Sequence, residues 1–471
     1  MPKLQHYHHF SPAAAILKSL AAIAFAALAG CSTMLPTIVP DMAERKPVVL
    51  EGAHGPLSAA QSKAILDKLK SKGEQTSIFD RHLALEEGIG ATPLVVGNKA
   101  TLLQNGPATY QAMFSAIRNA KSHVHMETYI FEDDEVGRRF ADLLIEKQRA
   151  GVQVALIYDS VGSIDAPKEF FTRLADSGVT VVEFNPINPL AAKAGWQVNQ
   201  RDHRKLLIVD GQVAFVGGIN ISGVYSTGTF SRGSKPSKNG SSAPWRDTQV
   251  QIEGPVVANF QKLFLQTWEK QKGEPLAQRN FYPKLTSKGT EVVRAVGSSP
   301  AEPYSLMYAT LISAIQNAET SVYLTNAYFV PDPQLREALK DAAKRGVDVK
   351  LILPGTTDSG LVLAAGHAYY SDLLGAGVKI YERRDALLHS KTALIDGVWA
   401  TIGSTNLDWR SFLHNDEINA VILGSEFCAQ MQRVFDADLA ASNPITLEQW
   451  EQRPVAERLK EITAKVWKYW L

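Results

Sequence analysis

Two stretches of the chain repeat a set of residue types that suits chemistry at a phosphate group. Each copy reads His-x-Lys-x-x-x-x-Asp, followed at the same offset by Gly-Gly-x-Asn or Gly-Ser-x-Asn. The copies consist of His203, Lys205, Asp210 and Asn220, and of His389, Lys391, Asp396 and Asn406. Imidazole can be a nucleophile or a general acid and base near neutral pH. Ammonium and amide groups can hold phosphoryl oxygens as negative charge develops on them.

The flanking residues predict the elements that position these groups. The apolar runs 206–209 and 393–395 are typical of strands buried on both faces. Side chains alternate between the two faces of a strand, so His203 and Lys205 should point the same way, as should His389 and Lys391. The glycines after each run favour a tight turn with close backbone approach.

A single copy has an ordinary interpretation, a buried strand that carries a hydrogen-bonded histidine. A motif match alone is only a hypothesis until its context agrees. Two copies with matching flanks favour the functional interpretation.

The doubled motif resembles the phospholipase D superfamily, and its flanks resemble the bacterial cardiolipin synthase branch. The resemblance runs from about Val95 to the end of the sequence, and its supporting segments are residues 127–134, 158–163, 245–248, 252–255 and 403–411. It implies an α/β fold with two tandem lobes, each a mixed sheet flanked by helices, and one active site between them.

The resemblance also implies a role for each motif residue. One histidine attacks phosphorus and the other protonates the leaving alcohol; we expect His203 to be the nucleophile and His389 the acid and base. The phosphoryl oxygens would be held by Lys205, Lys391, Asn220 and Asn406. Asp210 and Asp396 complete the catalytic motif, and we expect them to fix strand and loop geometry rather than to touch substrate.

A nucleophilic imidazole needs its second nitrogen held, because that contact sets the tautomer. Asp247 and Glu417 follow the two motifs at corresponding places and are the candidates for orienting the histidines, although either could be a surface acid. We expect no metal and no cofactor, because two lysines and two histidines supply the positive charge that a metal ion provides elsewhere.

The composition is that of an ordinary globular protein. The chain has 471 residues, of which 45% are hydrophobic and 21% charged, and a formal net charge of +1. A protein built to grip nucleic acid usually carries a basic surplus, so we expect no nucleic-acid partner. Cys31 and Cys428 are too few for a disulfide framework.

Residues 1–30 resemble the signal peptide of a bacterial lipoprotein. Basic residues precede a short apolar run that ends Leu28-Ala29-Gly30-Cys31, which resembles a lipobox. The resemblance implies lipidation of Cys31 and a protein held at a membrane facing the periplasm, with Ser32 favouring the outer membrane. A plain signal peptide or an uncleaved anchor is the alternative.

Helical and strand-like segments recur in the same order in the two halves, which predicts a duplicated domain. The predicted divisions are residues 31–106 (tether and N-terminal segment), 107–285 (first lobe), 286–445 (second lobe) and 446–471 (amphipathic helix). That helix could rest on a membrane or pack on the protein. A Gly/Ser/Lys-rich loop between Asn220 and Trp245 is a solvated insertion or a basic flap.

These observations predict a phosphatidyltransferase. A phosphatidyl group moves to His203, and a second alcohol then collects it; phosphatidylglycerol as acceptor gives cardiolipin. The alternatives are hydrolysis as a phospholipase D, a periplasmic nuclease of the superfamily, and a lipid-binding scaffold without activity.

Overall fold

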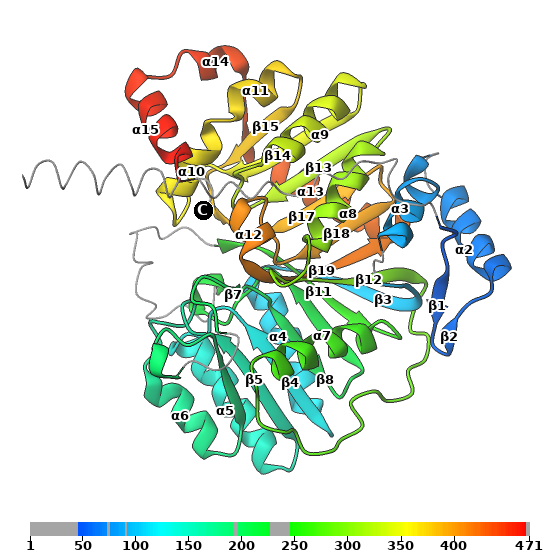
Figure 1. Cartoon of the computed structure of the whole chain (residues 1–471), viewed down its shortest axis with the longest axis vertical. Helices are drawn as coiled ribbons and strands as arrows, with labels where there is room; N and C mark the ends of the chain where they lie inside the picture. Colours follow the sequence, from blue (N-terminus) through cyan, green and yellow to red (C-terminus); the bar gives the residue numbers. More distant parts are fainter. Residues whose placement is uncertain (1–45, 73–75, 90–91, 192–195, 227–244, 468–471) are drawn as a thin grey trace, which may run out of the picture. The chain divides into compact units, whose positions relative to one another are not determined.

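The first half of the chain builds a mixed sheet (Figure 1). Its strands lie in the order β6 (Thr180–Phe184), β5 (Gln153–Asp159), β4 (His123–Thr128), β8 (Leu206–Val209), β9 (Val213–Gly217), β11 (Thr248–Glu253) and β3 (Leu94–Gln104). Strands β4, β5 and β6 are parallel because α5 (Glu135–Arg149) and α6 (Lys168–Asp176) make the crossovers. The remaining pairs are antiparallel. The computed structural model describes residues 46–72, 76–89, 92–191, 196–226 and 245–467.

The second half repeats this order. Its strands are β15 (Lys379–Arg383), β14 (Asp348–Pro354), β13 (Ser321–Asn326), β17 (Lys391–Ile395), β18 (Trp399–Gly403), β19 (Asn415–Leu423) and β12 (Glu291–Ser298). The crossovers contain α9 (Pro333–Lys344), α10 (Gly360–His367) and α11 (Tyr370–Gly375), and β20 (Ser442–Ile445) pairs with β15. The predicted α/β fold with two similar lobes is confirmed.

The two sheets join edge to edge. Strand β3 pairs with β12 in antiparallel fashion, so one hydrogen-bonded ladder runs through both lobes. Strand β3 precedes the predicted start of the first lobe at residue 107, yet it belongs to that lobe's sheet. Apolar residues from both lobes form one buried cluster that includes Val95, Phe260 and Ile422. Helices α4 (Asn105–Asn119), α7 (Val257–Lys270), α8 (Leu306–Gln316) and α13 (Ser425–Ala440) pack on the sheets.

The segment before β3 contacts both lobes: its residues 50–51 pair in parallel with β3 of the first lobe, and two of its side chains contact the second lobe. It contains β1 (Leu50–Gly52), β2 (Gly55–Pro56), α2 (Ala59–Lys72), η1 (Ser77–Phe79) and α3 (His82–Gly88). Thr76 Oγ1 donates a hydrogen bond of 2.5 Å to the Asp396 carboxylate, and Glu86 pairs with Arg294 of β12. No helix within the described residues is long and apolar enough to cross a membrane.

The chain ends in two helices, α14 (Leu447–Glu451) and α15 (Val455–Lys465). Most side chains of α15 are exposed; Glu461 and Ala464 are its buried residues. The expected apolar positions Val455, Leu459, Ile462 and Val466 are all more than half exposed. The helix itself packs against α10, so both alternatives, packing on the protein and resting on a membrane, stay predictions. Trp470 lies outside the described residues.

Candidate active site

The two motif histidines follow short strands that cross from one lobe to the other. Strand β7 (Arg201–Asp202) pairs in parallel with Asn415–Asp416 of β19, and the His203 N–H donates to the Asp416 carbonyl over 2.9 Å. In the same way β16 (Leu387–Leu388) pairs with β10 (Trp245–Arg246), and the His389 N–H donates to the Arg246 carbonyl over 2.8 Å. Each histidine therefore stands in register with an acid of the opposite lobe.

The expectation of one unbroken motif strand is wrong at the histidines. Residues 203–205 separate β7 from β8, and residues 389–390 separate β16 from β17. The break arises because the segment before each histidine pairs with the other lobe, whereas the segment after it returns to its own sheet. Lys205 Nζ turns back to donate to the His203 carbonyl over 2.5 Å, and Lys391 makes the equivalent contact with His389.

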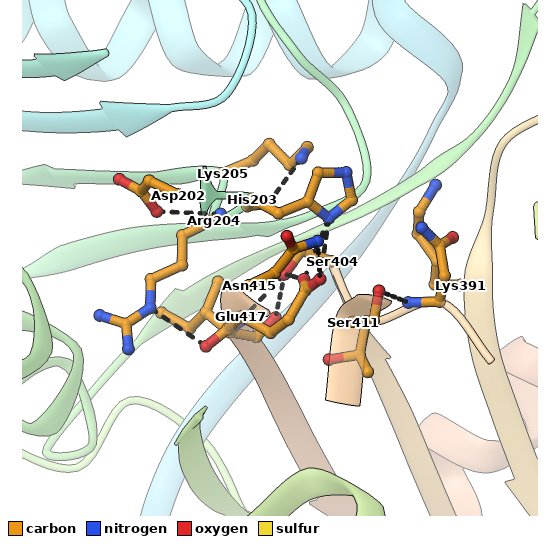
Figure 2. A network of polar contacts seen from close by, with 12 residues as sticks. Asp202, His203, Arg204, Lys205, Lys391, Ser404, Ser411, Asn415 and Glu417 are labelled. Atoms are coloured by element: carbon orange, nitrogen blue, oxygen red, sulfur yellow. Dashed lines mark hydrogen bonds and ion pairs between the residues drawn. The ribbon is translucent and has the colours of Figure 1, made fainter. Parts of the chain in front are cut away.

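His203 is held by Glu417. Its Nδ1 lies 3.0 and 3.1 Å from the two carboxylate oxygens, an arrangement visible in Figure 2. Glu417 also accepts from Ser404 Oγ and from Asn415 Nδ2. When Glu417 is ionised, its carboxylate accepts but does not donate, so Nδ1 carries the proton and Nε2 keeps its lone pair.

His389 is held by Asp247 in the reciprocal way. Its Nδ1 lies 2.7 Å from Asp247 Oδ2 and 3.3 Å from the Tyr225 hydroxyl. Both predicted orienting acids are thus fully buried and contact a histidine, which excludes the surface-acid alternative. Each acid contacts the histidine of the other half, a detail that their matching offsets in the sequence do not reveal.

The electrostatic environment keeps His203 neutral near pH 7. Burial lowers the pKa of its imidazole well below the usual value, and the positive charges of Lys205 and Lys391 lower it further. Burial and the Lys391 charge also lower the pKa of His389, against the opposing effect of Asp247. His389 itself contributes to the low pKa of His203.

The site lysines and Glu417 titrate near neutrality. Burial lowers the pKa of Lys205 to about 7 and that of Lys391 to about 8, even though neighbouring carboxylates oppose the shift. Burial raises the pKa of Glu417 to about 7, against the charge of Lys205 and the hydrogen bond from Ser404. Several groups of one buried site therefore change charge within a narrow range of pH.

The second residue of each Gly-Gly-x-Asn or Gly-Ser-x-Asn sequence, Gly218 or Ser404, matches the acid of its own half. A Cβ atom on Gly218 would lie 2.3 Å from Asp247 Oδ1, so only glycine leaves room for that carboxylate. The corresponding residue of the second half is Ser404, and its hydroxyl donates to Glu417. The Gly-Gly and Gly-Ser versions of the motif thus match an aspartate and a glutamate respectively.

Asp210 and Asp396 lie at the far end of the motif strand, roughly 20 Å of extended chain from the histidines. Asp210 is followed by Gly211, both with positive φ (54° and 64°), in the tight turn between β8 and β9. Its carboxylate accepts the N–H groups of residues 121–123, and Asp396 accepts those of residues 319–321. The structure therefore places both aspartates where they fix the turn and the start of the neighbouring strand, away from the site.

The two motif asparagines have different surroundings. Asn220 is buried; its Oδ1 accepts the Ile130 N–H over 3.1 Å and its Nδ2 donates to the Tyr225 hydroxyl over 2.9 Å. Asn406 is also buried, and within the described residues its Oδ1 has no hydrogen-bond partner. Asn220 thus reaches His389 through Tyr225.

Aromatic side chains wall both histidines and were not predicted as site residues. The Tyr129 ring lies 5.1 Å from that of His203, and Lys205 Nζ lies 5.1 Å from the centre of the same ring. Trp245, Tyr225 and Tyr328 surround His389 at ring distances of 5.1, 5.8 and 6.3 Å. The internal repeat offered a signal, since Tyr129 and Tyr328 end corresponding strand segments.

Two buried arginines, also missed, anchor the orienting acids. Arg204 Nε donates to the Glu417 carbonyl over 3.1 Å (Figure 2). Its other nitrogens reach Thr267 Oγ1 and the Ser298 carbonyl. Arg246 donates to the Asp247 carbonyl and pairs with the Asp438 carboxylate through Nε (2.9 Å) and Nη2 (3.0 Å). Each arginine therefore links a site acid to the opposite lobe.

Three predictions concern residues outside the described part of the chain. They are the lipidated Cys31, the signal segment 1–30 and most of the loop between Asn220 and Trp245. Within the described residues no group of three or more His, Cys, Asp or Glu side chains is placed to hold a metal ion.

Among solved structures, the fold matches the phosphatidylserine synthase of Haemophilus influenzae. The TM-score is 0.59, and the match covers 82% of this chain and 99% of that one. The sequence identity is 14%, so this likeness concerns the fold alone.

Comparison of the sequence identifies nearer relatives. The family described as "Cardiolipin synthase, PLD-like domain" matches residues 113–226 and 311–439, one match in each lobe. A cardiolipin synthase of Geobacillus kaustophilus is 35% identical over 387 residues, which cover 82% of this chain and 74% of the relative. Cardiolipin synthase A of Pseudomonas fluorescens is 36% identical, covering 80% and 75% respectively. The chain belongs to the cardiolipin synthase family of the phospholipase D superfamily.

Proposed function

We propose that this protein is a phosphatidyltransferase that makes cardiolipin from two molecules of phosphatidylglycerol. The supporting observation is the pair of buried histidines, each held at Nδ1 by a carboxylate of the other lobe and flanked by a buried lysine. The names of the relatives support the same reaction.

We assign the first step to His203, as the resemblance to the phospholipase D superfamily implies. With Nδ1 engaged by Glu417, Nε2 attacks phosphorus, and a bond forms between nitrogen and phosphorus. The bond from phosphorus to the glycerol oxygen breaks, and the protonated form of His389, which the Asp247 charge favours, gives that oxygen a proton. Lys205 and Lys391 stabilise the charge on the phosphoryl oxygens.

The second step reverses these roles. His389, now neutral, takes the proton from a glycerol hydroxyl of the second phosphatidylglycerol. That oxygen attacks phosphorus, and the phosphorus–nitrogen bond breaks. Cardiolipin is released, and His203 returns to its free form. One phosphodiester replaces another, so the exchange needs no nucleotide. Water in place of the second lipid would give phosphatidic acid instead, which is the reaction of a phospholipase D.

The test is expression in a host that lacks its own cardiolipin synthases, followed by mass spectrometry of the lipids. The unchanged chain should restore cardiolipin, whereas His203→Ala and His389→Ala should not. His54→Ala, a change of an exposed histidine, is the matched control and should restore cardiolipin fully. Accumulation of phosphatidic acid without cardiolipin would contradict the proposal in favour of hydrolysis.

We also propose that Cys31 is lipidated and holds the protein at a membrane facing the periplasm, with Ser32 favouring the outer membrane. The support is the apolar run that ends Leu28-Ala29-Gly30-Cys31. Labelled palmitate should be incorporated into the unchanged chain and not into Cys31→Ser. Incorporation in both would contradict lipidation at this residue.

A further inference from the structure

Exposed apolar side chains gather in two groups on the described part of the chain. One group, the loop set, consists of Val161, Ile164, Ile187, Leu190 and Val198, which follow β5 and β6. The other group lies on α10 and α15. The large apolar residues outside these groups that the described structure exposes are Val49 and Tyr282. Single exposed apolar residues are normal, but a concentration of them marks an interaction surface.

The second group centres on one face of α15. Val455, Leu459, Ile462 and Val466 are spaced by three or four residues and form one stripe, 58 to 70% exposed. Trp467 follows and is 49% exposed. These five residues are the α15 stripe. The helix is attached by its other face: Ala464 is buried, and Glu461 pairs with Arg453. The stripe therefore faces away from the protein, on a helix that packs against α10.

The α15 stripe is linked to the surroundings of His389 through α10. Helix α10 packs against α15 and carries Leu361, which is 45% exposed. Just before α10, Asp358 accepts a hydrogen bond of 2.6 Å from the Tyr328 hydroxyl. The Tyr328 ring lies 6.3 Å from that of His389.

The loop set is linked to His203 in the corresponding way. The residue after Val198 is Asn199, which accepts two hydrogen bonds from Arg410 of α12 (Trp409–Leu413), and the Arg410 charge lowers the pKa of His203. The residue before Ile164 is Ser163, whose hydroxyl donates to the carbonyl of Tyr129, the ring beside His203. Loops after parallel strands share one edge of a sheet, and Figure 1 shows β7, α12, α10 and α15 on the same side of the view.

We propose that the loop set, Leu361 and the α15 stripe form one docking surface that rests in the outer layer of a phospholipid bilayer, with the active site opening between them. The inference rests on the proposed function, because a phosphatidylglycerol substrate keeps its acyl chains in the bilayer while its headgroup enters the site. Arg458, Lys460 and Lys465 are exposed beside the stripe, and the exposed acid of the helix, Glu457, pairs with Lys460. The remaining positive charge suits an anionic lipid surface. Apolar residues on both lobes orient the site toward the membrane, which attachment at a single lipidated residue does not do.

The first test places an environment-sensitive fluorophore on the full chain. Ile462→Cys reports on the α15 stripe, and Tyr282→Cys is the matched exposed control. Native Cys428 is buried, and the chain without an added cysteine measures background labelling. With vesicles of phosphatidylglycerol and phosphatidylcholine, emission from position 462 should shift to the blue, and emission from position 282 should not. Equal shifts at both positions, or none at 462, would overturn the proposal. A concentration-dependent shift without vesicles would instead indicate contact with a second copy and would also overturn it.

The second test separates docking from chemistry. The variant L459S/I462S/V466S is compared with V49S/Y282S, on phosphatidylglycerol in vesicles and on a short-chain phosphatidylglycerol dispersed as monomers. The stripe variant should lose on the order of tenfold in vesicle activity, since interfacial binding scales with buried apolar area, and keep its activity on the monomeric substrate. Equal losses on both substrates, or no loss on either, would overturn the docking role. If the unchanged chain makes no cardiolipin from either substrate, the proposed function fails, and the fluorescence test still decides docking.

Discussion

Each motif histidine contacts a carboxylate that fixes its tautomer. Glu417→Gln keeps the size of the side chain but replaces the negative charge at His203 Nδ1, so we expect transfer to fall on the order of 10²- to 10⁴-fold. Asp247→Asn should lower the rate of transfer by a similar factor, because it removes the negative charge at His389 Nδ1. Single-turnover measurements should separate the two: if His203 is the nucleophile, Glu417→Gln slows formation of the phosphoenzyme. An unchanged rate of its formation would contradict the assignment.

The lowered lysine pKa values predict the alkaline side of the pH profile. Lys205 and Lys391 lose their protons as pH rises through about 7 and about 8, so stabilisation of the phosphoryl oxygens is lost in that range. Glu417 gains its charge as pH rises through about 7, which sets the acid side. Activity should therefore peak in a narrow range near neutrality.

Lys391→Arg is the matched test, because arginine stays protonated throughout this range. The variant should lose activity overall but keep a larger share of its maximum above pH 8 than the unchanged chain. An alkaline limb in the same position would show that Lys391 does not determine it.

Gly218 gives a prediction specific to one half of the site. Gly218→Ala places a methyl group where the Asp247 carboxylate lies, so His389 should lose its partner and activity should fall by about tenfold or more. Gly375→Ala is the control, because a Cβ there meets nothing within 4 Å and its φ is negative. Equal activity of the two variants would contradict a role for Gly218 in placing Asp247.

At the scale of elements, the pairing of two-residue strands determines which acid contacts which histidine. Pairing of β7 with β19 puts His203 beside Glu417, and pairing of β10 with β16 puts His389 beside Asp247. The sequence predicted all four residues, but not that each acid contacts the histidine of the other half. A pairing of two residues is too short to leave a hydrophobic pattern. Arg204 escaped prediction for a related reason: it occupies the variable position of the motif, where the other copy has Ser390.

Arg204 should contribute to stability as well as activity. Its guanidinium is buried and joins Thr267, Ser298 and Glu417, so Arg204→Ala leaves buried acceptors without a donor. We expect a loss of about 3–5 kcal/mol in the free energy of unfolding. Arg458→Ala removes an exposed arginine and should change it by less than about 0.5 kcal/mol. Urea unfolding midpoints provide the measurement, and similar midpoints for both variants would contradict the anchoring role.

At the scale of the whole molecule, we expect activity to require both histidines in the same chain. A mixture of His203→Ala and His389→Ala proteins should therefore stay inactive, because each molecule lacks half of the chemistry. The control is a mixture of the unchanged chain with His203→Ala, which should keep about half of the activity. Recovery of activity in the mixture of variants would show that lobes of different molecules can form a site together.

It was possible to predict the duplication, the α/β fold and the paired motifs from the sequence, because they rest on periodicity and on repetition of residue types. The continuity of the sheet through β3 and β12 could not be predicted, since β3 lies in a segment that the repeat pattern does not cover. The aromatic residues around the histidines were missed because buried aromatics are common in any core.

The reciprocal pairing of β7 with β19 and of β10 with β16 has a consequence for the history of the protein. Neither half can acquire a new partner for its own histidine, because that partner is encoded in the other half. A substitution at Glu417 alters the chemistry of His203, and one at Asp247 alters that of His389. The two copies can therefore change their chemistry only together, as a single unit.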